Sequence, residues 1–169
     1  MVSPSKPTNT AEEQIRTLGI EIPNAPKPLG LYVEAVQSRN LLFLTGAMPT
    51  LTGKPKFVGR LGAHLTAQDG FEAARLAGIN ALAITREYLG TLDRVTRILK
   101  TEVYMVTTDD FVPELPYVAD GVSELLRDVF GADKLSTRKV VGIANIPLRV
   151  PVMVELLLEI ADKIASPMQ

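Results

Sequence analysis

The spacing of hydrophobic residues changes along the chain and predicts two long helices. In residues 66–90, apolar and small side chains recur every three or four positions, as on one face of an amphipathic helix. Asp69 stands in the first turn, where a negative charge favours the helix dipole. A second stripe with this spacing covers residues 115–129 and is followed by Gly131, a residue type that commonly ends helices. We therefore predict a helix over each segment.

Alternation of apolar and polar residues predicts strands elsewhere. Two such segments flank the polar turn at residues 37–40, which is typical of a hairpin. Two further apolar segments near the end of the chain meet at a turn marked by Pro147. The expected strands are residues 31–36, 41–46, 56–59, 97–107, 136–147 and 148–161.

The order of these elements predicts the architecture. Strands, a helix, a strand, a helix and two strands indicate an α+β domain, with both helices packed on one face of a mixed sheet. In the last strand Val152, Leu156 and Ile160 lie on a wholly apolar face, and the opposite face is largely apolar apart from two glutamates. A strand that is apolar on both faces is normally buried on both. We therefore expect another subunit to cover the second face in a homo-oligomer.

The ends of the chain are predicted to differ from its centre. Residues 1–10 are rich in Ser, Thr, Pro and Lys and are expected to form a disordered leader. A helix from residue 11 to about residue 18, capped by Thr10, and a proline-rich extended arm would then occupy residues 11–30. The α+β domain is expected to cover residues 31–161, and residues 162–169 to form a tail.

The composition indicates a soluble protein of one domain. The chain has 169 residues, of which 46% are hydrophobic and 22% charged. A formal net charge of −1 offers no general basic surface for nucleic acid. The first ten residues contain no apolar stretch like that of a signal peptide, and no apolar run approaches the length needed to span a membrane. A cytoplasmic location is the simplest expectation.

The residue types limit the chemistry that the chain can perform. There are no cysteines, which excludes disulfides, thiolate nucleophiles and cysteine-ligated metals. His64 is the single histidine, so a site with several histidine ligands is excluded, and we interpret it as a surface or interface residue. The cluster Arg94, Arg97 and Lys100 has no interleaved aromatic residues and indicates a solvated or interface surface rather than an RNA site.

Arg138 is the candidate ligand-binding residue. It heads a strand face that continues with Val140 and Gly142, so small side chains leave room beside the guanidinium. A guanidinium holds a carboxylate through two parallel hydrogen bonds. The alternative is an ordinary salt bridge at the end of a strand.

Several motifs, in this order and spacing, resemble the RidA/YjgF family, also called L-PSP endoribonuclease-like. The resemblance covers residues 11–161. It is closest to a longer subgroup with an N-terminal helix. The matching segments are Gly30-Leu31-Tyr32-Val33, Leu44-Thr45-Gly46-Ala47-Met48-Pro49, Leu92-Asp93-Arg94-Val95, residues 137–147, Leu18-Gly19-Ile20 and Val129-Phe130-Gly131.

The resemblance implies a fold and an activity. Members have a chorismate-mutase-like α+β fold and form homotrimers with ligand clefts between subunits. The best-known members hydrolyse 2-imino and enamine acids to 2-keto acids and ammonia, without a metal or an organic cofactor. The small carboxylate ligand and the trimer are therefore expectations for this chain.

The resemblance also implies a set of site residues. Arg138 matches the arginine that grips the substrate carboxylate. Tyr32 matches an aromatic residue of the pocket, Thr45 matches a hydroxyl residue, and Gly46 completes the pocket. Alternative interpretations are that Tyr32 is a packing residue and that Thr45 is an ordinary strand residue.

Two positions depart from the family pattern. The carboxylate that positions water in active members falls on Met153, which can neither accept a proton nor orient water. Glu155 lies two residues further, on the same strand face and about 6–7 Å along it, and a bulge at residues 149–151 could move it into place. Alternatively Glu155 pairs with a basic residue. Asp120 replaces an expected asparagine and could act as a base or repel an anionic substrate.

The sequence thus leaves three functional hypotheses. The first is a trimeric enamine/imine deaminase in which Arg138 clamps the carboxylate and Glu155 or Asp120 helps to activate water. The second is a noncatalytic protein that binds or senses small carboxylates, which Met153 favours. Ribonuclease activity is the third, and the residues supply neither the histidine nor the acid–base pair that such chemistry usually needs.

Overall fold

The computed structural model describes residues 9–161, so most of the expected leader and all of the expected tail lie outside the described residues. The helices are α1 (Ala11–Thr17), α2 (Ala67–Leu89) and α3 (Leu115–Phe130). The strands are β1 (Ala35–Ser38), β2 (Leu41–Leu44), β3 (Thr50–Leu51), β4 (Lys54–Pro55), β5 (Val95–Met105), β6 (Thr137–Gly142) and β7 (Val152–Ile160).

The helices begin and end where the sequence predicts. At the start of α2 the Thr66 hydroxyl accepts a hydrogen bond from the backbone N–H of Asp69 (3.1 Å), and the Asp69 carboxylate accepts one from the N–H of Thr66 (2.8 Å). Gly90 ends the helix with a φ of +83°. Thr10 and Glu13 form the same reciprocal cap on α1. Each signal lies within a few residues, so it can be recognised locally.

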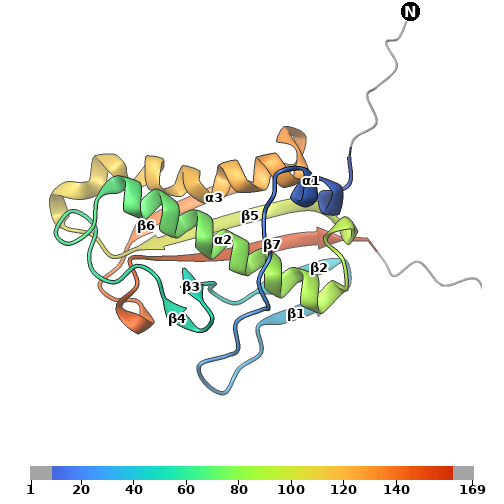
Figure 1. The fold of residues 1–169 in the computed structure, drawn as a ribbon, viewed down its shortest axis with the longest axis horizontal. Helices are drawn as coiled ribbons and strands as arrows, with labels where there is room; N and C mark the ends of the chain where they lie inside the picture. Colours follow the sequence, from blue (N-terminus) through green and yellow to red (C-terminus); the bar gives the residue numbers. More distant parts are fainter. Residues whose placement is uncertain (1–8, 162–169) are drawn as a thin grey trace, which may run out of the picture.

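The sheet is mixed, as predicted. Its strands lie in the order β1-β2-β7-β5-β6; β5 and β6 are parallel and the other neighbouring pairs are antiparallel. The chain passes from β5 to β6 through α3, and α2 and α3 lie side by side across one face of the sheet (Figure 1). The short β3–β4 hairpin forms a separate two-stranded sheet.

The core lies between the helices and this face of the sheet. The β7 side chains at positions 152, 154, 156, 158 and 160 are at most 3% exposed. They face alanine-rich α2, whose Ala73, Ala77 and Ala81 are fully buried. Gly121 of α3 lies so close to α2 that a Cβ there would clash with the backbone carbonyl of Phe71. Small residues therefore allow the two helices to pack closely on each other and on the sheet.

Four predicted strands differ from the observed ones by more than two residues. The strand expected at 136–147 ends at Gly142. The expected strand at 56–59 is wrong, because Thr52 and Gly53 have φ of +50° and +78° and form a tight turn that pairs β3 with β4 instead. The first hairpin is correct, but β1 begins at Ala35 rather than at residue 31. The last strand begins at Val152 rather than at 148, because positive φ at Leu148 (+59°) and Arg149 (+57°) interrupts the extended backbone.

Among residues 9–161, no helix has both the length and the apolar character needed to cross a membrane.

Candidate functional site

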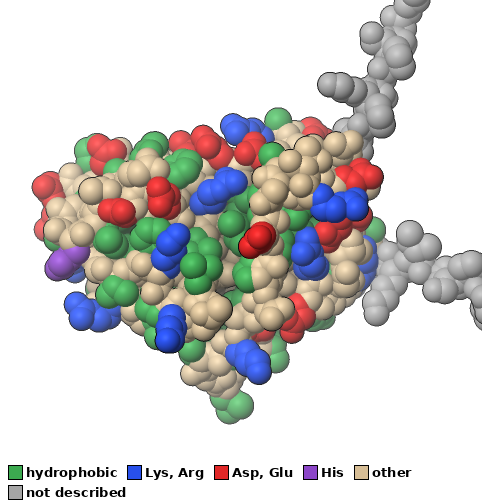
Figure 2. Space-filling view, in the orientation of Figure 1, with side chains coloured by type: hydrophobic (Ala, Val, Ile, Leu, Met, Phe, Trp, Pro, Cys, Tyr) green, Lys and Arg blue, Asp and Glu red, His purple; other side chains and the backbone are tan. Residues whose placement is uncertain are grey.

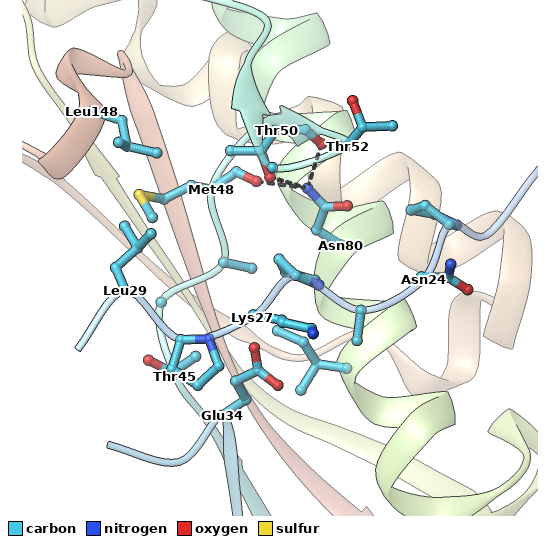
Figure 3. A pocket seen from close by; sticks show the side chains of 18 of the residues that line it. Asn24, Lys27, Leu29, Glu34, Thr45, Met48, Thr50, Thr52, Asn80 and Leu148 are labelled. Carbon is cyan, nitrogen blue, oxygen red and sulfur yellow. Dashed lines mark hydrogen bonds between the residues drawn. The ribbon is translucent and has the colours of Figure 1, made fainter. Parts of the chain in front are cut away.

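A cavity of about 460 Å³ lies between the proline-rich arm and α2. Its walls are residues 23–29 of the arm, the segment just before β1, the loop that follows β2, and one side of α2 (Figure 3). We call it the arm pocket. Partly buried apolar side chains of the arm, including Ile20, Ile22 and Ala25, pack against the core and hold the arm in place.

Asn80 of α2 anchors one wall of the arm pocket. This side chain is only 2% exposed, and its amide nitrogen donates to the backbone carbonyls of Met48 (2.7 Å) and Thr50 (2.9 Å). Figure 3 shows both bonds joining the helix to the loop after β2. Buried backbone carbonyls need such partners, so Asn80 holds this loop at a defined distance from α2.

Glu34 brings a carboxyl group to the same pocket, which Lys27 of the arm also lines (Figure 3). Partial burial, and secondarily the negative charge of Glu87, raise the pKa of the Glu34 carboxyl above its usual value. The pocket therefore contains a carboxyl group that takes up a proton more readily than an exposed one. Sequence reasoning missed Glu34 and Asn80, since neither belongs to a recognisable motif.

Three of the expected site residues meet at the arm pocket. Tyr32, Thr45 and Gly46 all line it. The Tyr32 hydroxyl accepts a hydrogen bond from the backbone N–H of Leu29 (3.0 Å), which closes the loop between the arm and β1. Gly46 lies against Met153, because a Cβ at residue 46 would be 2.8 Å from Met153 Cγ. Met153, at which the resemblance led us to expect a carboxylate, thus packs against Gly46 of the pocket wall.

Arg138 and Asp120 form a second group. Arg138 lies on the edge strand β6 opposite Thr101, whose side chain is buried under the helices, so both point to the helix-covered face. Arg138 Nη1 donates to Asp120 Oδ1 (2.6 Å) and to Ser123 Oγ (3.0 Å) of α3. The salt bridge that the sequence left as an alternative is therefore present.

Within one chain these two groups lie apart. β6 and the β1–β2 hairpin lie at opposite edges of the sheet, and β5 and β7 lie between β6 and β2. Three steps between adjacent strands separate β6 from β2 by about 14 Å, which exceeds the reach of an arginine side chain. Arg138 of one chain thus does not contact Thr45 or Gly46 of that chain.

Glu155 lies on the other, helix-free face. It is opposite Glu102 of β5, whose Oε1 contacts Lys100 Nζ (2.8 Å) and the Lys139 ammonium. Hydrogen bonds from Lys100 and then Lys139 lower the pKa of Glu102 to about 2. Burial, and then the negative charge of Glu102, raise the pKa of Glu155. Glu155 therefore belongs to a charged cluster of two carboxylates and two lysines.

The expected bulge before Glu155 is not found. The pairing of β7 with β5 runs without interruption from Leu156 to Val152, and its irregularities lie near the other end of β5. Met153 therefore keeps its place opposite Tyr104, and Glu155 stays two pairs further along the ladder, opposite Glu102. Because the register is regular, Glu155 does not occupy the position of Met153 within its own chain.

The described part of the chain contains no group of three or more acidic or histidine side chains that could hold a metal ion. The arm pocket and the Arg138–Asp120 pair therefore offer hydrogen-bonding groups, carboxyl groups and one guanidinium.

A model of one protein family matches most of the chain. Residues 12–160 match the family described as "YjgF/chorismate mutase-like, putative endoribonuclease". The chain belongs to the YjgF/RidA family. Its mixed sheet and helices are those of the chorismate-mutase-like α+β fold, as the sequence predicts.

Individual YjgF/RidA relatives support the assignment over most of the chain. Protein TCP17 of Trypanosoma cruzi is 35% identical over 147 residues, covering 86% of this chain and 91% of that protein. A crystal structure from Shewanella oneidensis, described as a "putative endoribonuclease", has 30% identity and a TM-score of 0.84, covering 90% and 100% of the two chains. Atu1372 of Agrobacterium tumefaciens, of unknown function, has 29% identity and a TM-score of 0.80, covering 89% and 92%.

Proposed function

We propose that this YjgF/RidA protein binds small 2-imino or 2-keto carboxylic acids in clefts between the subunits of a homotrimer. We further propose that it hydrolyses enamine and imine acids to 2-keto acids and ammonia. The observation that carries the proposal is that the expected site residues lie at two opposite edges of the sheet. Arg138 is on β6 at one edge, and the residues of the arm pocket are next to the β1–β2 hairpin at the other. In a ring of identical copies, the β6 edge of one copy meets the hairpin side of the next, and each contact completes one site.

Exposed apolar side chains support such a ring. On the helix-free face, Val36 is 52% and Phe43 46% exposed. In the loop before β1, Leu31 is fully exposed and Val33 is 65% exposed. This loop projects at the lower end of Figure 1, and the corresponding tip of the surface is apolar in Figure 2. Exposed apolar side chains of this kind favour burial by a partner, here a second copy of the chain.

Arg138 retains the means to bind a carboxylate. Its bonds to Asp120 and Ser123 use Nη1, and Nη2 reaches the Pro116 carbonyl only at 3.5 Å. A guanidinium carries five N–H donors in a fork, so Nε and Nη2 can grip both oxygens of a carboxylate. Asp120 offsets part of the positive charge, which lowers the affinity of this site for anions.

Asp120 is the better placed of the two candidate bases. Its carboxylate lies beside the proposed carboxylate clamp, whereas Glu155 lies on the opposite face of the sheet. In the proposed reaction a water oxygen bonds to the imine carbon while Asp120 accepts the water proton. The electron pair of the protonated carbon–nitrogen double bond moves to the nitrogen, which takes the proton back from Asp120. The remaining carbon–nitrogen bond then breaks and ammonia leaves, while Asp120 accepts the proton of the new hydroxyl group and the carbonyl of the keto acid forms.

The first experiment tests catalysis. 2-Iminobutyrate is generated in situ, and its loss is followed with wild-type protein and the Arg138→Ala variant. We expect an acceleration over buffer that the variant abolishes. Loss of imine no faster than in buffer, with a folded protein that still binds 2-oxobutanoate, would instead favour a noncatalytic carboxylate-binding protein. Met153, which packs against Gly46 where a carboxylate is expected, is the specific observation behind that alternative.

The second experiment tests the division of the site between subunits. Arg138→Ala and Tyr32→Ala proteins are unfolded together, refolded as a mixture, and titrated with 2-oxobutanoate by calorimetry. An intersubunit site predicts that about a quarter of the sites in an equal mixture regain both residues. A site within one chain predicts no recovery in the mixture.

RNA cleavage is the third possibility, because the matched family is described as an endoribonuclease. Cleavage that persists in purified Arg138→Ala protein would be required to support it.

A further inference from the structure

The single histidine lies in a small pocket that is separate from the proposed carboxylate site. This cavity of about 170 Å³ is lined by Arg60, His64, Asn145 and Arg149, together with apolar and glycine residues. It adjoins the turn at residues 147–149, and the arm pocket lies beyond this turn, since Leu148 lines the arm pocket and Arg149 lines the histidine pocket. Figure 2 shows the histidine side chain at one end of the molecule.

The local backbone holds the His64 ring in a defined orientation. The backbone N–H of Arg60 donates to His64 Nδ1 (3.3 Å), so in the neutral ring the proton lies on Nε2. The N–H groups of residues 63, 64 and 65 all point to the Arg60 carbonyl, at 3.3, 2.9 and 3.2 Å. Gly59 provides the space, because a Cβ there would lie 2.8 Å from His64 Cβ. His64 therefore presents an N–H donor from an ordered loop.

Arg149 is held in an unfavourable backbone conformation. Leu148 and Arg149 are consecutive non-glycine residues in the left-handed region, with φ of +59° and +57°. This conformation is unfavourable, because it brings the Cβ atom close to the following carbonyl oxygen. The Arg149 carbonyl accepts a hydrogen bond from the Gly59 N–H (2.9 Å), which ties this turn to the histidine loop. Backbone strain that the surrounding structure maintains is concentrated at functional sites.

The pocket has an unbalanced positive charge. No acidic residue lines it. Within residues 9–161, Arg60, His64 and Arg149 form no ion pair, whereas Arg86, Arg127 and Arg138 each pair with a carboxylate. Two arginines, a histidine and an asparagine thus line a cavity large enough for a small anion. These residues come from two separate segments, so they can contact an oxyanion with several acceptor oxygens, such as phosphate, from more than one side.

We propose that this pocket binds a phosphate group, either as inorganic phosphate or as the terminal group of a phosphate monoester. Arg60 and Arg149 bind the anionic oxygens, and His64 and Asn145 donate further hydrogen bonds. The site uses neither Arg138 nor Tyr32, so it is independent of the proposed function.

The test is calorimetric titration of the full chain with inorganic phosphate at low ionic strength. We expect saturable binding of one phosphate per chain, and an affinity about tenfold weaker in each of Arg60→Gln and Arg149→Gln, as expected for loss of one charged contact. Arg16→Gln removes the same charge from the exposed end of α1 and should leave the affinity unchanged. Arg138→Ala should also leave it unchanged. Thermal melts confirm that each variant folds.

Competing anions distinguish the possible ligands. Methyl phosphate that binds as tightly as inorganic phosphate identifies a monoester site, whereas methyl phosphate that does not bind identifies a site for free phosphate. Acetate that binds as tightly as phosphate would overturn the assignment. The assignment would also be overturned if Arg16→Gln and Arg149→Gln lowered the affinity for phosphate equally, or if no binding were found at millimolar phosphate. Backbone amide shifts on phosphate addition should be confined to residues 59–65 and 145–150.

Discussion

The two faces of β7 are built from similar residues but have different surroundings. The even-numbered side chains from Val152 to Ile160 are at most 3% exposed beneath α2 and α3. The odd-numbered ones, which include Met153 and Leu157, remain only partly buried, and none of the helices among the described residues lies over them (Figure 1). An apolar pattern therefore indicates that a face needs covering, but the covering can come from this chain or from another.

The comparison extends to the charged residues. The helix-free face carries Glu102, Glu155 and two lysines near its centre, whereas Arg138 and Asp120 pair at the edge of the helix-covered face. The candidate groups for binding and for water activation are thus divided between two faces. For this reason we assign Asp120, and not Glu155, to the proposed site around Arg138.

The largest expected effect is a difference in folding stability between substitutions on the two faces of β7. Leu158→Ala opens a cavity in the core and should lower the free energy of unfolding by about 2–5 kcal/mol. Leu157→Ala removes the same atoms from the helix-free face and should cost less than about 1 kcal/mol in dilute protein. Urea denaturation at several protein concentrations measures both. Equal losses that do not depend on concentration would mean that the chain itself buries both faces.

A second substitution tests whether another copy covers the helix-free face. Phe43→Lys places a charge among its apolar residues and should convert the oligomer to monomers without unfolding the chain. Sedimentation velocity gives the mass. Tyr88→Lys is the matched control, because Tyr88 is equally exposed (45% against 46%) but lies on α2. Dissociation by the control alone would assign the interface to the helices.

The charged cluster predicts a pH effect on stability. The pKa of Glu102 is about 2 in the folded chain and near 4.5 ordinarily, so the unfolded chain binds more protons between these values. Stability contributed by ionised Glu102 is therefore complete above pH 4.5 and is lost as the pH falls toward 2. Glu102→Gln should flatten the stability profile in this window, as measured by urea denaturation.

Glu155→Gln provides the opposite control. The pKa of Glu155 is raised, so the folded chain binds the extra proton and stability falls as the pH rises above 4.5. Above pH 4.5, the free energy of unfolding should therefore fall less in Glu155→Gln than in the wild-type protein. Identical profiles of stability against pH for Glu102→Gln and Glu155→Gln would contradict the opposite pKa shifts of the two glutamates.

The smallest expected effect concerns the edge of the helix-covered face. Asp120→Asn removes the carboxylate that competes for Arg138, and should raise the affinity for 2-oxobutanoate by up to about fivefold, as expected for a partly exposed ion pair. If Asp120 also accepts the water proton, imine turnover should fall in the same variant. Weaker keto-acid binding would show that Asp120 positions the guanidinium rather than competing for it.

Local signals explain which elements could be predicted. The caps at Thr10, Thr66 and Gly90 act within one turn of helix, so sequence reasoning located α1 and α2 closely. The pairing of β3 with β4 and the late start of β7 were missed, because they depend on positive φ at Thr52, Leu148 and Arg149. These residue types rarely adopt that conformation, and only their surroundings impose it.

The candidate site was predictable only in part. Arg138, Tyr32, Thr45 and Gly46 could be selected by their place in family motifs, but Glu34 and Asn80 could not. Asn80 enters the arm pocket because α2 packs against a loop that lies 30 residues earlier in the chain. No short segment of sequence contains that contact.

The sequence alone determined the fold class, the two long helices, the family and the candidacy of Arg138, because periodicity, capping and motif spacing are local properties. Only the tertiary structure decided that Arg138 pairs with Asp120 on one face while Glu155 joins Glu102 on the other. The physical reason is register. Alternation within a strand shows which residues share a face, but hydrogen bonds between strands decide which faces of different strands coincide and what packs against them.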